Sequence, residues 1–147
     1  MIEINNLTTV SVDEKFLKEV IEKVLAEEGE KGNLSIAFVG PGKMKKVNKS
    51  YLGRNRTTDV LSFPEKKIKL KQFKMGSLEK SKNLGEIIIC LREVKKNAKR
   101  YGVDFKAELV RVLIHGLLHL FGYDHEQSEK EAQKMEEKQN YYLSLIS

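Results

Sequence analysis

Short runs of apolar residues along the chain predict four β-strands. Residues 2–5 alternate apolar and polar side chains, which is the pattern of a strand with one buried face. Residues 34–39 and 59–63 form two further strand segments, and Pro64 ends the second because proline cannot donate to a sheet ladder. Residues 85–90 are apolar almost without interruption, which indicates a strand covered on both faces.

Apolar residues spaced three and four apart predict about five helices. The first begins near Asp13 and ends at Gly29, and Asp104 can cap the start of a later one. Residues 109–120 are apolar on nearly all sides, as in a helix buried in a core. The other helices are expected after the turn at residues 40–42, over residues 92–100 and over residues 128–145.

These elements predict an α+β fold in which a small mixed sheet of about four strands packs with about five helices. A chain of 147 residues is long enough for one core, so residues 1–147 are expected to form a single domain. Residues 65–82 hold seven lysines and little periodicity, which predicts a mobile loop or an edge hairpin.

The composition favours a folded protein of the cytoplasm. The longest apolar runs are far shorter than the ~20 residues that a membrane span needs, and the first residues do not resemble a signal sequence, so no membrane is expected as a partner. Cys90 is the single cysteine, so the chain can form neither an internal disulfide nor a thiolate zinc cluster. Any metal site must use other ligands.

The positive charge is concentrated in the middle of the chain. The formal net charge is +6, and residues 41–101 carry 18 basic residues against 5 acidic ones, whereas both flanking segments are acidic. A basic block of this kind favours association with a polyanion such as a nucleic acid. A lysine-rich solvated surface explains the same pattern without a partner.

All three histidines lie within eleven residues, at positions 115, 119 and 125. His115 and His119 are four apart on the expected helix and therefore share one face. Gly122 can end that helix and let the chain reverse, which brings His125 back to the first two. Three imidazoles can hold one zinc ion and leave a coordination position open, as catalytic sites do, although nickel, copper and iron also accept this ligand set.

The histidine spacing equals that of the zinc helix in metzincin peptidases, with one difference. Gly116 stands where those enzymes carry a glutamate general base, so peptide hydrolysis would lack its usual base. Asp124 and Glu126 flank His125 and are candidates for a base or for a carboxylate that orients a ligand. The alternative is that both are solvated loop residues.

The segment 115–125, together with residues 58–64 (Thr-Asp-Val-Leu-Ser-Phe-Pro) and 85–90 (Gly-Glu-Ile-Ile-Ile-Cys), resembles the bacterial YbeY family of zinc-dependent endoribonucleases. The resemblance implies a single-domain α+β fold, one zinc ion held by the three histidines, and cleavage of single-stranded RNA. It also implies a role in maturing the 3′ end of the 16S ribosomal RNA precursor, a role in ribosome quality control, and the small ribosomal subunit as a partner.

One position departs from the family pattern. The family usually reads Tyr-Arg-Gly-Lys before the Thr-Asp-Val-Leu-Ser-Phe-Pro stretch, and its arginine is functional, whereas here Leu52 takes that place. A guanidinium is needed because the phosphate transition state gains negative charge. Arg54 and Arg56 are near enough in sequence to substitute, and Arg54 is the predicted replacement.

The sequence therefore predicts a metal-dependent endoribonuclease with His115, His119 and His125 as metal ligands and catalytic residues, and with Arg54 as a further catalytic residue. For Thr58, Asp59 and Ser62, capping of turns and strands explains the residue types at least as well as substrate contact does, so these residues stay outside the catalytic set. Two alternatives remain open. One is a zinc hydrolase acting on peptides, and the other is a ribosome-associated protein that holds RNA without cutting it.

Overall fold

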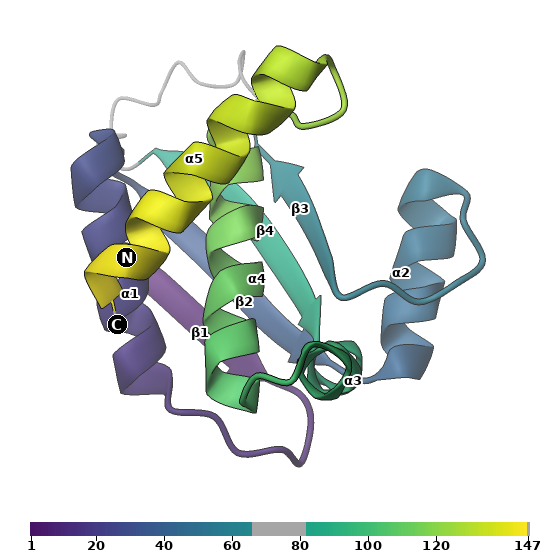
Figure 1. Cartoon of the computed structure of the whole chain (residues 1–147). Coiled ribbons are helices and arrows are strands. Elements are labelled where there is room, and N and C mark those ends of the chain that lie inside the picture. Colours follow the sequence, from purple (N-terminus) through teal and green to yellow (C-terminus); the bar gives the residue numbers. More distant parts are fainter. Residues whose placement is uncertain (66–81, 147) are drawn as a thin grey trace, which may run out of the picture.

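The computed structural model describes residues 1–65 and 82–146. Within these residues, four strands form one mixed sheet in the order β1-β2-β4-β3. Strands β1, β2 and β4 run parallel to one another, and β3 runs antiparallel to β4, as Figure 1 shows. The strands are β1 (Ile2–Asn6), β2 (Asn33–Val39), β3 (Val60–Pro64) and β4 (Asn83–Cys90). The predicted α+β fold with a four-stranded mixed sheet is thus confirmed.

Five helices occur in the described part of the chain, as predicted. They begin where their caps indicate: Asp13 accepts a hydrogen bond from the Phe16 amide at 3.2 Å, and Asp104 accepts one from the Ala107 amide at 2.8 Å. The helices are α1 (Glu14–Glu28), α2 (Pro41–Leu52), α3 (Leu91–Tyr101), α4 (Phe105–Leu120) and α5 (Glu129–Ile146).

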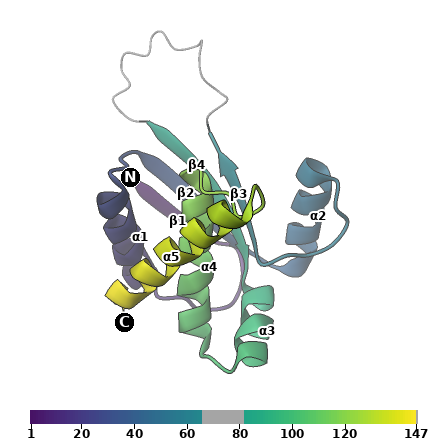
Figure 2. The same ribbon diagram turned by 45° about the horizontal axis from the view of Figure 1, so that its top comes forward.

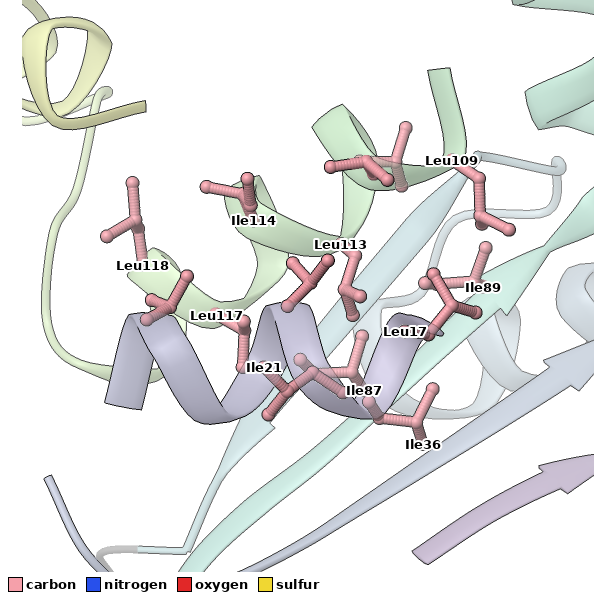
Figure 3. Packing of buried hydrophobic residues seen from close by; sticks show 14 of the residues in the cluster. Leu17, Ile21, Ile36, Ile87, Ile89, Leu109, Leu113, Ile114, Leu117 and Leu118 are labelled. Atoms are coloured by element: carbon pink, nitrogen blue, oxygen red, sulfur yellow. The ribbon is translucent and has the colours of Figure 1, made fainter. Parts of the chain in front are cut away.

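Helices α1 and α4 cover one face of the sheet and enclose the main core. Figure 3 shows leucines and isoleucines of the two helices meeting Ile36, Ile87 and Ile89 of the strands, which are all 0% exposed. Because side chains alternate along a strand, every second residue of β2 and β4 points to this core. Helix α5 then lies across α4 in both views (Figures 1 and 2).

Helix α2 covers part of the opposite face of the sheet. Its Met44 is fully buried in a second apolar cluster with Leu61 and Cys90. Strand β4 therefore contributes to apolar clusters on both faces, as its continuous apolar sequence predicted.

Some strand boundaries differ by one or two residues from the sequence-based expectation. Pro64 is the last residue of β3 and pairs with Gly85, which is possible because β3 is an edge strand. Strand β4 begins two residues earlier than expected, at Asn83. The loop or hairpin predicted over residues 65–82 falls mostly on residues 66–81, which lie outside the described part of the chain. No helix of the described residues is long and apolar enough to cross a membrane.

Candidate metal centre

The three histidines converge at the end of α4. His115 and His119 lie one turn apart, and their ring centroids are 4.7 Å from each other. Gly122 follows the helix with φ +102°, a conformation that side chains with a Cβ rarely adopt, and the chain turns so that His125 returns. The His125 ring lies 5.4 Å from that of His115 and 5.0 Å from that of His119. One ligand atom from each residue lies within 4.8 Å of the others, so the three can hold one metal ion.

A glutamine from α5 orients the first of these rings. The Nδ1 atom of His115 lies 3.0 Å from Oε1 of Gln139. Since an amide oxygen only accepts, the His115 Nδ1–H is the donor and its Nε2 atom remains available as a ligand. Such hydrogen bonds commonly support metal-binding histidines. Gln139 is 24 residues from His115, and the sequence analysis did not find it.

The environment keeps two of the imidazoles neutral. Burial lowers the pKa of His115, although its hydrogen bond with Gln139 partly opposes that effect. Burial, followed by the charges of the other two imidazoles, also lowers the pKa of His119. Neutral imidazole is the form that binds a metal ion, so the site is prepared for one near neutral pH.

The histidines lie in a cleft of about 410 Å³. Its other walls come from β3 and from the segment that follows α2. Arg54 and Arg56 lie in the segment after α2, and Leu52, the last residue of α2, lines the same cleft. The cleft therefore brings basic side chains and candidate metal ligands to one place.

A buried asparagine anchors the arginine-bearing wall. Asn48 is 2% exposed, and its Nδ2 donates to the backbone oxygen of Arg56 at 2.9 Å. The Arg54 amide donates to the Asn48 backbone oxygen at 3.3 Å, so two bonds join this wall to the end of α2. Asn48 also lines the cleft, and sequence reasoning missed it because a single asparagine in a lysine-rich helix carries no distinct signal.

Gly116 marks the closest approach of α4 to the sheet. A Cβ at this position would lie 3.2 Å from methyl carbons of Ile87 and Val60, and 3.3 Å from Oγ of Ser62. The Ser62 hydroxyl donates to the Gly116 backbone oxygen at 3.0 Å. Position 116 thus faces β3 and β4, so a glutamate there would be crowded by the sheet, and this argues against a metzincin-type peptidase.

The acidic residues near the cleft have different surroundings. Asp124 accepts a hydrogen bond from the Glu126 amide at 2.9 Å and so shapes the turn before α5. Glu126 lines the cleft, with its Oε2 3.9 Å from Nε2 of His125. Burial raises the pKa of Asp59, and the nearby Arg111 opposes that shift. Thr58, Asp59 and Ser62, which the sequence analysis kept outside the catalytic set, all line the cleft.

The fold and the site together define an α+β protein with a three-histidine centre that can hold a metal ion, placed in a cleft with a basic wall. Comparison with known proteins agrees. Residues 3–147 match the family described as Endoribonuclease YbeY. The chain therefore belongs to this family and is a metal-dependent endoribonuclease.

Individual relatives extend over most of the chain. An Endoribonuclease YbeY of Persephonella marina is 41% identical over 128 residues, which cover 85% of this chain and 78% of that protein. One from Thermodesulfovibrio yellowstonii is 46% identical over 113 residues, which cover 77% of this chain and 66% of the relative. The solution structure of a Thermotoga maritima protein is similar with a TM-score of 0.66 at 32% identity, and covers 99% of this chain and 89% of the other.

Proposed function

We propose that this chain is a zinc-dependent endoribonuclease of the cytoplasm that cuts single-stranded RNA, matures the 3′ end of 16S ribosomal RNA and takes part in ribosome quality control. Its partners are the 16S precursor and the small ribosomal subunit, and residues 1–147 act as one domain. The proposal rests above all on the convergence of His115, His119 and His125 in a cleft that Arg54 also lines.

The three histidines fit zinc. Neutral imidazole nitrogens are among its preferred ligands, and three of them leave a fourth position open. Zinc held there supplies a Lewis acid that stabilises negative charge on the scissile phosphate. Gln139 keeps the His115 ring in the orientation and tautomer that present its Nε2 atom. Burial keeps His115 and His119 unprotonated near neutral pH.

Basic side chains on and after α2 suit the RNA backbone. Lys45, Lys46 and Lys49 are exposed on α2, and Arg54 and Arg56 follow in the cleft wall. Figure 2 shows α2 standing beside β3, the strand that lines the cleft with the histidines. Contacts of basic side chains with phosphates do not depend on the RNA sequence, and the binding that they provide weakens as the salt concentration rises. They would hold a single strand across the cleft.

Arg54 is proposed to replace the arginine expected at position 52. Leu52 and Arg54 line the same cleft, which supports the proposal that the guanidinium of Arg54 serves there in place of the family arginine. The anchoring of this wall by Asn48 limits its movement. The role of Arg54 is to donate hydrogen bonds to phosphate oxygens as they gain charge.

An end-labelled RNA that carries the 16S 3′ precursor region tests the proposal. Zinc-loaded native protein should cut its single-stranded part, whereas His119→Ala should bind the RNA without cutting it. If neither protein cuts and both bind the RNA, the nuclease assignment of this site is wrong. A duplex of the same sequence should remain intact.

Arg54→Ala and Arg100→Ala form a matched pair that tests the proposed role of Arg54. Arg100 is exposed at the end of α3 and does not line the cleft. Loss of a group that stabilises transition-state charge typically costs about a hundredfold in turnover. Arg54→Ala should show this loss, and Arg100→Ala should cut as the native protein does. Equal rates for both variants would remove Arg54 from the catalytic set.

A further inference from the structure

One carboxylate outside the cleft joins three parts of the fold. Glu28, the last residue of α1, has a side chain that is 9% exposed. It accepts hydrogen bonds from the Tyr123 hydroxyl at 3.0 Å and from the Tyr142 hydroxyl of α5. Lys138, also on α5, places its Nζ 3.2 Å from the same carboxylate. Both oxygens of Glu28 are therefore engaged.

Tyr123 connects this carboxylate to the candidate metal centre. It lies in the short segment between Gly122, where the chain reverses, and His125. Its amide donates to the Leu118 backbone oxygen at 3.1 Å, and its ring packs against the main core. The hydroxyl reaches away to α1, so Tyr123 is held at both its backbone and its far end.

The charge on Glu28 makes these contacts strong. Burial alone would raise the pKa of its carboxyl, but the hydrogen bonds from Tyr142, Lys138 and Tyr123 outweigh burial and hold the pKa below its ordinary value. Glu28 is thus ionised near neutral pH. Hydrogen bonds to an ionised acceptor are about twice as strong as neutral ones.

We propose that Glu28 is a positioning residue of the metal centre: through Tyr123 it ties the segment that carries His125 to α1 and α5, and so holds the third ligand in place. His115 and His119 both lie on α4, so the helix fixes the positions of their backbones. His125 is more exposed and follows the glycine at which the chain reverses. The inference rests on the proposed ligand set, and it extends the site to residues that do not line the cleft.

The chain offers a matched control for this inference. Tyr141 of α5 donates its hydroxyl to Glu27 of α1 at 3.0 Å. This bond joins the same two helices through the same pair of residue types, but it is exposed and does not reach the His125 segment. Tyr142→Phe is a second comparison, because it removes a bond to Glu28 and leaves the Tyr123 bond intact.

The measurement is the zinc affinity of the full chain, obtained by competition with a chromophoric chelator, together with thermal unfolding of the metal-free proteins. Tyr123→Phe should weaken zinc binding several-fold, which is less than the about tenfold loss typical of removing a hydrogen bond made directly to a ligating histidine. Tyr141→Phe should bind as the native protein does. Tyr142→Phe should lower the unfolding temperature and change the affinity by less than Tyr123→Phe.

These outcomes distinguish failure of the positioning role from failure of the proposed function. If native protein binds zinc, His119→Ala does not, and Tyr123→Phe binds as tightly as native, then the ligand set stands and the positioning role is wrong. An affinity that simply follows thermal stability across the three tyrosine variants also overturns the positioning role. A native protein that binds no zinc overturns both.

Discussion

Gln139 gives the sharpest test of how the fold prepares the metal centre. Gln139→Met keeps the length of the side chain and removes the oxygen that accepts from the His115 Nδ1–H at 3.0 Å. The imidazole then loses the contact that selects its tautomer and orientation. A half-buried donor is also left without its protein partner.

The expected loss of zinc affinity in Gln139→Met follows from this geometry. A buried donor that loses its partner costs about 1–3 kcal/mol, and loss of a hydrogen bond to a ligating histidine typically weakens metal binding by about 10–100-fold. A factor of ten corresponds to about 1.4 kcal/mol. Since His115 is half-buried, water can replace part of the lost bond. We therefore expect the lower end, with zinc binding about tenfold weaker.

Zinc titration in competition with a chelator measures this change. Gln133→Met is the matched control, because Gln133 lies exposed on the same helix and contacts Glu137 rather than a histidine. Gln139→Glu restores an acceptor and should keep or strengthen binding. If Gln139→Met binds zinc as tightly as Gln133→Met does, the hydrogen bond does not support the site and the reasoning fails.

Three further predictions follow from the same structure. Gly116→Glu should lower the free energy of unfolding, measured in urea, by more than about 2 kcal/mol, because the new side chain meets β3 and β4. It should not create peptidase activity. Native-like stability of this variant would contradict the packing described for position 116. Glu28 has a folded-state pKa below its ordinary 4.5, so its ionised form stabilises the fold above that pH and the contribution is lost as pH falls through the folded pKa. The stability difference between native and Glu28→Gln should therefore be largest above pH 4.5 and shrink below it, and a constant difference would refute this. Zinc at about a hundred times its Kd should stabilise the native protein by about 2.7 kcal/mol and raise its Tm by about 5–10 °C, whereas an equal shift in His119→Ala would place the ion elsewhere.

The sequence by itself determined the local structure of the candidate site and predicted which three histidines come together there. Asp13 and Asp104 mark helix starts because a cap depends only on residues three positions away. The spacing of His115 and His119 places them on one face through helix geometry alone, and Gly122 permits the reversal through its own φ angle. These are short-range effects, so a pattern of neighbouring residues is enough to predict them.

The tertiary structure alone decided what surrounds those ligands. Gln139 meets His115 only because α5 crosses α4, and Glu28 meets Tyr123 across 95 residues of sequence. The place of Arg54 and Leu52 in one cleft likewise depends on how α2 ends beside β3. Such contacts depend on the order of the strands and on how whole helices pack. The residues next to each partner in the sequence therefore do not reveal which distant residue it meets. A histidine pattern can therefore predict a metal site, but only the packed fold identifies the residues that support and surround its ligands.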